Sequence, residues 1–427
     1  MPVPRRLEPL RDPVKLHFDG RAIVAERGEP AAVSLLAAGH LAIARSPKFH
    51  RPRGPACLRA ACDGCLARVD DVPNVMTCRV PAADGMRIET QNVVGSVDTD
   101  LLRMSDWFFP EGMNHHELFA GVPGVQQVMQ ALARRVAGLG RLPAGEIEPP
   151  REAHRRQVDA LVVGAGPAGM NTALLLVKQA RRVEVVDDAL VWGGSARALP
   201  GEAAGPWSAL IEAFSNAVVM GDLRLRMRTT AAAIFGEDVL LAGEEGLELA
   251  TPGTLVIATG AHDGVLPFEG NDLPGILSAR AAGWIASLGV ELGERVVVVL
   301  ADGGGPFGEA CASVIRGATL VKGTPLRAGG SSRVKEVTVA TASGEQTLRC
   351  DALVVDAPRA PAYELAAQAG ATLAHEPRGF VVHTDEAGRI RSGVYAVGEV
   401  TGTALHPAAM ARAAAAAVES LAPPAAP

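Results

Sequence analysis

The sequence predicts a protein of mixed α/β and α+β class, with a small N-terminal domain of hairpins and a larger domain of alternating strands and helices. Two observations carry this prediction. Four of the six cysteines lie close together near the N-terminus, between residues 57 and 78. Farther along, a strand runs into a glycine-rich loop and a helix near residue 160. With 427 residues, at ~150 residues per domain, the chain has room for two or three domains.

Composition and net charge limit the classes of protein to which this chain can belong. Apolar residues make up 48% and charged residues 21% of the chain, as in ordinary globular proteins. The net charge of −6 argues against a general nucleic-acid binder. No run approaches the ~18 consecutive apolar residues of a membrane helix, and the N-terminus lacks the apolar region of a secretory signal. We therefore expect a cytoplasmic protein without a membrane span or a nucleic-acid partner.

The clustered cysteines have the spacing C-x4-C-x2-C-x12-C. Because disulfides are disfavoured in a chain without an export signal, the cluster indicates metal binding or redox chemistry. The first three cysteines have the spacing of the plant-type ferredoxin loop, in which four thiolates hold a [2Fe–2S] cluster. A structural zinc site, the alternative, would more naturally show two C-x2-C pairs. The predicted cluster ligands are Cys57, Cys62, Cys65 and Cys78.

The segments around the cysteines favour one small fold. Alternating apolar residues on both sides of Asp19-Gly20 predict a hairpin, and apolar residues at helical spacing predict a short helix before Gly39. A second hairpin is expected to carry Cys78. The predicted strands span residues 14–18, 21–25, 66–69, 74–77 and 85–90, and the helix spans residues 29–38. Two hairpins and a helix make a β-grasp, ferredoxin-like domain, which we assign to residues 1–95.

A basic stretch precedes the cysteines, and a connecting segment follows the small domain. The basic residues are Arg45, Lys48, His50, Arg51 and Arg53. They indicate either a solvated loop that offsets the charge of a thiolate cluster, or a docking or phosphate-binding loop. The connecting segment, residues 96–157, holds an aromatic run at 107–110, which is either a plug between domains or a partner contact. It also contains the unassigned His115-His116 pair, a predicted helix at 125–137 and a polar linker at 146–157.

A dinucleotide-binding unit begins at residue 160. An apolar strand (160–163) runs into a G-x-G-x-x-G loop, a helix to about residue 179, a second strand (183–186) and Asp187. Gly164 allows the tight turn, Gly166 lets the backbone approach a pyrophosphate, and Gly169 permits close packing of the helix on the strand. The helix N-terminus supplies N–H donors for the phosphates, and Asp187 is expected to bind the ribose. The loop residues assigned to the nucleotide are Gly164, Gly166, Pro167, Ala168 and Gly169.

Three later segments favour FAD over NAD as this dinucleotide. The turn at residues 193–195 and the segments 255–260 and 393–399 resemble motifs of flavoproteins that bind two dinucleotides. The last motif normally ends in Asp, which binds the ribityl chain; Glu399 is one methylene longer. The further predicted FAD contacts are Gly194, Ser195, Thr259, Gly260, Gly398 and Glu399. We assign the FAD domain to residues 158–285 and 355–420, within which an Ala/Pro-rich tail begins at 408, and a disordered tail to residues 421–427.

A second glycine motif, at residues 303–308, fits the G-x-G-x-x-G pattern but not its context. The strand after it ends in Lys322 rather than an acid, and only one β-α-β unit fits between residues 294 and 324. We interpret residues 286–354 as a shortened NAD(P)-like domain. NAD(P) binding is not expected there, and a glycine-rich core turn is the simpler account.

Together, the motifs resemble the large subunit of the hetero-oligomeric amine and imino-acid dehydrogenases. This group includes hydrogen cyanide synthase, opine and octopine dehydrogenases, hydroxyproline and proline dehydrogenases, and sarcosine oxidase. The resemblance covers roughly residues 13–420. Besides the four cysteines, it is carried by SPKFHRPRG at 46–54, DWFFPEG at 106–112, AGLGRLP at 137–143, GAGPAG at 164–169, VIATGAHDGVLPFEGNDLPG at 256–275 and YAVGEVTG at 395–402. It implies a β-grasp [2Fe–2S] domain fused to an FAD domain.

The resemblance also implies a division of work between subunits. A separate amino-acid-oxidase-like flavoprotein oxidises the C–N bond, and the large subunit passes the electrons to a downstream acceptor. An FMN shared at the subunit interface stays an open possibility. We therefore predict an electron-transfer subunit with FAD and [2Fe–2S], and assign no catalytic acid or base. Two alternatives remain: a self-contained NAD(P)H:acceptor oxidoreductase, and an assembly subunit with a structural flavin.

Overall fold

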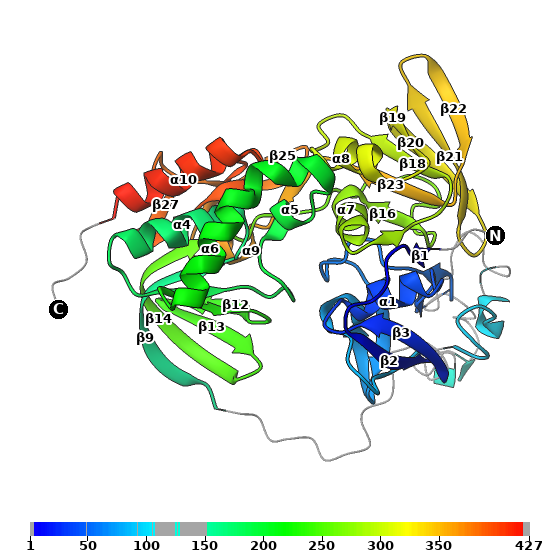
Figure 1. Ribbon diagram of the computed structural model, residues 1–427, viewed down its shortest axis with the longest axis horizontal. Coiled ribbons are helices and arrows are strands. Elements are labelled where there is room, and N and C mark those ends of the chain that lie inside the picture. The colour runs from blue at the N-terminus through cyan, green and yellow to red at the C-terminus, as the bar shows by residue number, and fades with distance from the viewer. Residues whose placement is uncertain are drawn as a thin grey trace.

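The computed structural model describes residues 4–47, 49–91, 93–104, 106, 124, 125, 127, 128 and 152–421. In Figure 1 the N-terminal domain, in blue, lies beneath the yellow-green part of the chain, and the green and red elements form a second body beside them. This mixed architecture confirms the predicted fold class. Within the described ranges, no helix has both the length and the apolar character needed to cross a membrane. The aromatic run, the His115-His116 pair, most of the helix predicted at 125–137, the AGLGRLP segment and residues 422–427 lie outside the described residues.

The N-terminal domain is built on a five-stranded sheet with the order β3-β2-β8-β6-β7. Its elements are β2 (Pro13–Phe18), β3 (Arg21–Glu26), α1 (Ala31–Ala37), β6 (Leu66–Val69), β7 (Val72–Met76) and β8 (Arg87–Glu89). The alternation in β2 turns Val14, Leu16 and Phe18 into the core. At the first hairpin, both Asp19 and Gly20 have positive φ, as a tight two-residue turn requires. The predicted hairpins and helix are thus confirmed, with Cys78 placed just past β7 in the turn η1 (Thr77–Arg79).

The larger body contains an eight-stranded sheet in which β9 lies between β10 and β14, all three parallel. The sheet comprises β9 (His154–Val163), β10 (Val183–Val186), β11 (Leu223–Arg226), β12 (Thr230–Phe235), β13 (Asp238–Gly243), β14 (Gly246–Ile257), β27 (Arg389–Arg391) and β28 (Val394–Ala396). Its helices are α4 (Pro167–Lys178), α5 (Gly194–Arg197), α6 (Ser208–Met220), α9 (Glu364–Gln368) and α10 (Pro407–Glu419), with the 3-10 turns η3 (Gly201–Trp207) and η4 (Gly398–Thr401). In parallel sheets ligands bind at the carboxyl ends of the strands, which here are the ends near residues 163, 186 and 257.

A second parallel sheet has the order β16-β23-β18-β19. Its strands are β16 (Ile276–Ser278), β18 (Val296–Leu300), β19 (Ala318–Lys322) and β23 (Ala352–Asp356), and its helices are α7 (Ala279–Ser287) and α8 (Phe307–Val314). An antiparallel sheet of β20 (Thr324–Gly330), β21 (Val334–Thr341) and β22 (Gly344–Arg349) packs against it. The single β18-α8-β19 unit agrees with the predicted shortened domain, although β16 lies before its predicted start at residue 286.

Short paired strands tie the remaining segments together. The pairs are β1 (Arg5–Arg6) with β17 (Val290–Glu291), β4 (Ala44–Arg45) with β5 (Pro52–Arg53), β15 (Ala261–His262) with β24 (Ala360–Pro361), and β25 (Thr372–Glu376) with β26 (Gly379–His383). The first pair links the N-terminal segment to the chain between α7 and β18. The described structure also contains the 3-10 turn η2 (Leu101–Arg103).

Two segments differ from the sequence expectation. Residues 154–157, expected to lie in a linker, extend β9, because they pair with β14 along the register from Glu248 to Thr251. Residues 408–419, expected to lie in an Ala/Pro-rich tail, form α10, which packs on α4. Alanine is the strongest helix former, and Pro407 occupies the first turn, where proline is favoured.

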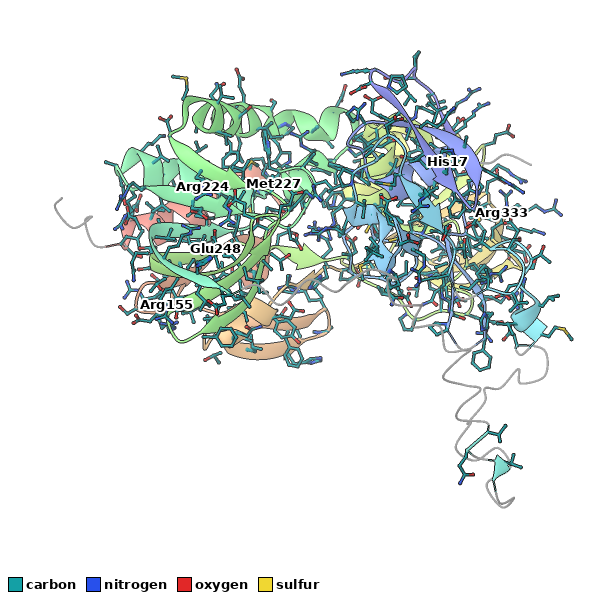
Figure 2. The ribbon with its side chains drawn as sticks, turned by 90° about the horizontal axis from the view of Figure 1, so that it is seen from below. His17, Arg155, Arg224, Met227, Glu248 and Arg333 are labelled. Carbon is teal, nitrogen blue, oxygen red and sulfur yellow. The ribbon has the colours of Figure 1, made fainter. Side chains whose placement is uncertain are left out.

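The ladder of the eight-stranded sheet is reinforced by a network of four charged side chains. Arg156 and Arg226 each contact both Glu184 and Glu248, with N–O distances of 2.5 to 3.1 Å. Figure 2 shows Glu248 on this body, near the labelled Arg224 and Arg155. Burial alone would raise the pKa of Glu248, but hydrogen bonds and charge from Arg226 and Arg156 lower it overall. The network therefore joins β9, β10, β11 and β14 through ionised groups.

The N-terminal domain is docked against the larger body through its cysteine loop. The N–H of Ser278 donates to the carbonyl of Ala56 at 2.9 Å, and Arg53 forms an ion pair with Asp272 at 2.5 Å. On the other side, Arg79 forms an ion pair with Asp188 at 2.8 Å. Apolar side chains of α1 join the core of the larger body. The cysteine loop thus lies at the interface between the N-terminal domain and the rest of the chain rather than at a free surface.

Candidate functional site

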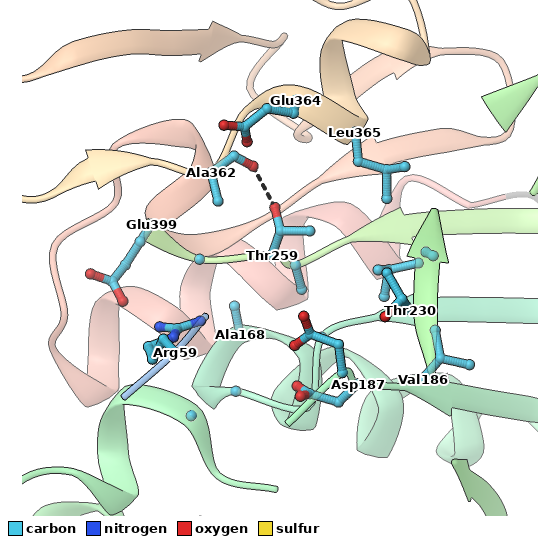
Figure 3. Close-up of a pocket in the computed structure, with 18 of the residues that line it drawn as sticks. Arg59, Ala168, Val186, Asp187, Thr230, Thr259, Ala362, Glu364, Leu365 and Glu399 are labelled. Carbon is cyan, nitrogen blue, oxygen red and sulfur yellow. Dashed lines mark hydrogen bonds between the residues drawn. The ribbon is translucent and has the colours of Figure 1, made fainter. Parts of the chain in front are cut away.

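A cavity of about 300 Å³ opens at the carboxyl ends of β9, β10 and β14. Figure 3 shows its lining, with Asp187 and Ala168 on one wall, Thr259, Ala362 and Glu364 on another, and Glu399 and Arg59 at one end. Ten of the twelve residues predicted to bind FAD line this cavity; they are Gly164, Gly166, Pro167, Ala168, Asp187, Gly194, Ser195, Thr259, Gly260 and Glu399. Gly169 and Gly398 lie behind the wall, where they allow its elements to approach one another.

The glycine loop has the geometry that its spacing predicts. Gly164 has φ +109°, and a Cβ there would overlap the carbonyl oxygen of Ala258. A Cβ on Gly169 would overlap the carbonyl oxygen of Gly164, and one on Gly398 would come 2.5 Å from the Cβ of Ala168. At Gly166, by contrast, the nearest atom would be the Cα of Gly194, 3.9 Å away. Gly164, Gly169 and Gly398 are thus required by packing, whereas Gly166 leaves open space at the N-terminus of α4.

Asp187 lies at the end of β10, next to the glycine loop. Its carboxylate accepts the N–H of Ala165 at 2.7 Å and the N–H of Ala189 at 2.8 Å. Burial raises the pKa of Asp187, although these two N–H groups oppose the shift. Each oxygen keeps further acceptor capacity for a ribose hydroxyl. Asp187 therefore holds the loop in shape and can also receive a nucleotide.

The flavin-type motifs meet on the opposite wall. The hydroxyl of Thr259 donates to the carbonyl of Ala362 at 2.7 Å, which fixes the turn at Gly260 (Figure 3). Ser195 donates to Glu399 at 3.1 Å, and Arg359 forms an ion pair with Glu399 at 2.8 Å. The carboxylate of Glu399 is therefore held by two protein partners. If it also binds a ribityl chain, as the motif predicts, the ribityl hydroxyls must share the carboxylate with Ser195 and Arg359.

Three arginines at this end of the cavity were not identified from the sequence. Arg280 is buried, contacts Asp263 at 2.7 Å and donates to the hydroxyl of Ser195 at 3.3 Å. Burial lowers its pKa to about 10. Arg359 holds Glu399, and Arg59 enters from the cysteine loop. Each comes from a segment far along the chain from the glycine loop, so no local spacing marks it.

The structure brings all four clustered cysteines together as two pairs. The sulfurs of Cys57 and Cys62 are 3.4 Å apart, and Cys65 and Cys78 are hydrogen-bonded to each other. No disulfide joins them, and none of the described cysteines is paired covalently. A tetrahedral metal with bonds of ~2.3 Å to sulfur places two ligand sulfurs ~3.7 Å apart, close to the first distance.

Backbone N–H groups surround these sulfurs. The N–H of Arg59 donates to the sulfur of Cys57 at 3.4 Å, and N–H groups of the same loop approach Cys62 and Cys78. The hydrogen bond from Cys57 lowers the pKa of Cys62 to about 5, and the bond from Cys78 lowers the pKa of Cys65. The same two hydrogen bonds raise the pKa of Cys57 and of Cys78, so one thiol of each pair ionises before the other. Thiolates are the form that binds metal.

The paired arrangement agrees with a binuclear cluster, in which each metal ion takes two of the four sulfurs. In the described part of the chain, no three His, Cys, Asp or Glu side chains converge as ligands of one metal ion. Two pairs of thiols match a [2Fe–2S] cluster, in which four cysteines are shared between two irons. The donor set therefore fits the cluster predicted from the spacing. The space in front of Gly166, where a Cβ would meet only the Cα of Gly194, is likewise open to the pyrophosphate of a dinucleotide.

The second glycine loop differs from the first in one respect. The N–H groups of Gly305 and Gly308 both donate to the carboxylate of Asp356, at 3.1 and 2.6 Å. Asp356 is only 3% exposed, and burial raises its pKa while these N–H groups oppose the shift. Lys322, at the end of β19, faces Glu309 at 3.6 Å. An internal carboxylate thus occupies the position that a phosphate takes at such a loop.

The basic stretch before the cysteines is tied to acidic partners. His50 contacts Asp100 at 2.8 Å with both side chains buried, and Arg51 contacts Asp106 at 2.6 Å. Arg45 is buried and donates to the carbonyl of Val97 at 2.8 Å. These residues fasten the loop to the chain that follows β8, an arrangement that neither sequence interpretation anticipated. Lys48 lies outside the described residues.

Two protein-family models match separate parts of the chain. Residues 11–93 match the model described as "2Fe-2S iron-sulfur cluster binding domain". Residues 158–325 match the model described as "Pyridine nucleotide-disulphide oxidoreductase". The chain therefore combines an iron–sulfur domain with a dinucleotide-type oxidoreductase domain, which confirms the predicted class of protein at the level of its domains.

Curated relatives are subunits of oxidoreductases. The chain is 29% identical to the alpha subunit of sarcosine oxidase from Rhizobium meliloti over 63% of its own length and 30% of that protein. It is 31% identical to the HcnB subunit of hydrogen cyanide synthase from Pseudomonas protegens over 28% of each chain. It is 27% identical to an opine oxidase subunit from Agrobacterium tumefaciens over 58% of its own length and 62% of that protein. These relatives confirm the resemblance, although the chain spans under a third of the sarcosine oxidase protein.

A solved structure has the same fold over nearly the whole chain. The crystal structure of L-proline dehydrogenase from P. horikoshii superposes with a TM-score of 0.70, covering 97% of this chain and 75% of that one, at 21% identity. At this identity the likeness establishes the fold alone.

Proposed function

Since its domains and its relatives are those of oxidoreductase subunits, we propose that this chain is the electron-transfer subunit of a multi-subunit amine, amino-acid or imino-acid dehydrogenase. FAD would occupy the cavity at the carboxyl ends of β9, β10 and β14. A [2Fe–2S] cluster would be held by Cys57, Cys62, Cys65 and Cys78. A separate amino-acid-oxidase-like flavoprotein subunit would oxidise the substrate, with or without an FMN at the interface, and a downstream acceptor would take the electrons.

One observation carries the proposal: the two candidate sites adjoin. A second cavity has Cys57, Arg59 and Cys78 on one side and Asp187 and Gly194 on the other, so it runs from the cysteine pairs to the dinucleotide cavity. An electron-transfer subunit needs its redox groups close together and shielded by protein. The docking of the cysteine loop between the two bodies provides this proximity.

Each part of the chain has a simple task in such a subunit. Bound FAD exchanges two electrons and a [2Fe–2S] cluster exchanges one, so together they link two-electron oxidation to one-electron transfer. The thiolates of the four cysteines bind the irons, and the N–H of Arg59 donates to the sulfur of Cys57. The first turn of α4 offers N–H donors to the pyrophosphate. No acid–base step is required of the protein.

The division of work is tested with the purified chain alone. We expect no turnover of glycine, sarcosine, proline or an opine by this chain, since substrate oxidation belongs to the other subunit. Co-purification with an amino-acid-oxidase-like partner should restore amine-dependent reduction of the flavin and the cluster. Oxidation of an amine by the single chain would refute the proposal.

The competing NAD(P)H:acceptor reductase is tested by anaerobic titration with NADH and then NADPH, following flavin bleaching and cluster absorbance. We expect no bleaching by either nucleotide, because Asp356 already occupies the phosphate position of the second glycine loop. Dithionite should reduce both groups. Prompt bleaching would favour the reductase. A redox titration separates the third function, because a structural flavin would not cycle in the potential range of the cluster.

A further inference from the structure

Arg59 belongs to the cysteine loop, between Cys57 and Cys62, yet its side chain leaves the iron–sulfur domain. It lines the dinucleotide cavity together with the glycine loop of α4 and with Glu399. Figure 3 shows it at the end of the cavity, between the labelled Glu399 and Ala168. A residue of one domain thus forms part of the wall of the nucleotide site in the other.

The guanidinium of Arg59 is held loosely and keeps its charge available. One nitrogen donates to the carbonyl of Ala261 at a distance of 3.4 Å. No carboxylate among the described residues lies within ion-pair distance of it, unlike Arg53, Arg79, Arg280 and Arg359 at the same interface. Arginine has five N–H donors, so most of them are left for a ligand in the cavity.

The charges around the cavity show why a cation is needed there. Four carboxylates line it, those of Asp187, Asp188, Glu364 and Glu399, whereas Arg59 is the one arginine or lysine in the described lining. A pyrophosphate adds two negative charges to this wall. The N-terminus of α4 offsets only about half a charge. Arg359 and Arg79 already pair with Glu399 and Asp188, so Arg59 is the cation in the described lining whose charge is left to face a pyrophosphate.

We propose that Arg59 binds a phosphate oxygen of the adenine dinucleotide, so that the iron–sulfur domain completes the nucleotide site of the neighbouring domain. The inference rests on the proposed function, which places an adenine dinucleotide in this cavity. Guanidinium–phosphate hydrogen bonds are charge-assisted and can be bidentate. Because the N–H of the same residue donates to the sulfur of Cys57, one residue contacts both redox groups.

The test compares Arg59→Gln and Arg59→Lys with the wild type in the full-length chain. The dissociation constant of FAD is measured by equilibrium dialysis, and ADP and adenosine are then used as competitors. We expect Arg59→Gln to weaken FAD and ADP about 10- to 100-fold, the range of a hydrogen bond to a charged group, and to leave adenosine within about twofold. Arg59→Lys should recover part of the lost affinity, because lysine keeps the positive charge but lacks the bidentate donors of the guanidinium.

Arg53→Gln is the matched control. It also removes an interdomain arginine, the partner of Asp272, but Arg53 does not line the cavity. Arg53→Gln should therefore leave FAD, ADP and adenosine binding unchanged, and retained cluster absorbance in both variants shows that the cysteine loop is folded.

The outcomes separate the two proposals. If the wild type binds FAD but Arg59→Gln binds FAD and ADP as tightly, the role of Arg59 is refuted while the FAD site stands. An equal loss of adenosine and ADP affinity would also refute it, because only a phosphate contact discriminates between them. If the wild type binds neither FAD nor ADP, the proposed function fails together with the inference.

Discussion

Replacing Gly166 by valine tests the assignment of the dinucleotide cavity. Gly166 has φ −82° and ψ −174°, which valine adopts without strain. A Cβ there would meet no atom nearer than 3.9 Å, so we expect the free energy of unfolding to change by less than about 1 kcal/mol. The same side chain would stand between the N-terminus of α4 and a pyrophosphate. Losing two hydrogen bonds to a charged phosphate costs ~3–6 kcal/mol, or at least a hundredfold in affinity.

The assay is the ratio of FAD to protein in the purified variant, with cluster absorbance as an internal standard. We expect Gly166→Val to keep the cluster and to lose FAD. Gly169→Ala is the contrasting control, because its Cβ would overlap the carbonyl oxygen of Gly164 and should prevent the β9–α4 unit from folding. Stoichiometric FAD in folded Gly166→Val would show that the pyrophosphate does not approach the chain at this loop.

Three further predictions concern the cysteines, the ion-pair network and the basic stretch. Cys62→Ser should abolish cluster absorbance while FAD stays bound, because the glycine loop lies in the other domain; loss of both groups would show that the domains fold as one unit. Glu248→Gln should cost ~1–3 kcal/mol at neutral pH, since Arg226 and Arg156 lose a charged partner. The pKa of Glu248 is lowered on folding, so its contribution is complete above its ordinary pKa near 4.5 and is lost as the pH falls through the folded value. Melting curves between pH 3 and pH 7 should therefore converge for the wild type and this variant at low pH, and a constant gap would contradict the sign. Asp100→Ala leaves the buried ring nitrogen of His50 without its hydrogen-bond partner and should destabilise the N-terminal domain by ~1–3 kcal/mol, measured as earlier loss of cluster absorbance on heating; an unchanged midpoint would be inconsistent with this contact.

The features that the sequence predicted best are those set by local spacing. The end of β9, the helix α4 and the strand β10 are found within about a residue of their expected limits, because glycine positions and apolar periodicity act over short distances. The two hairpins of the N-terminal domain follow the same rule. The four cysteines are also close in sequence, so their spacing alone predicted that they would meet.

The features that the sequence did not predict depend on contacts between distant segments. Arg59 reaches the nucleotide cavity because the cysteine loop docks against the larger body. Arg359, which follows β23, meets Glu399, which follows β28 in the other sheet. No motif encodes such docking. Helix α10 was missed for another reason: its alanines give little apolar periodicity, although small side chains such as Ala414 and Ala417 are what allow it to pack closely in the core.

The carboxylate of Asp356 has a consequence for how the two nucleotide-type units respond to ligands. The loop before α8 carries its own counter-anion, Asp356, so we expect an added phosphate group to stabilise that unit little. In the loop before α4, Asp187 accepts the N–H of Ala165, but no carboxylate among the described residues accepts an N–H of the first turn of α4. We therefore expect the stability of this unit to depend on its ligand. A ligand at a hundred times its dissociation constant adds ~2.7 kcal/mol to the stability of the unit that binds it. FAD should therefore protect the β9–α4 unit from hydrogen exchange, while the β18–α8 unit exchanges at the same rate with or without any nucleotide.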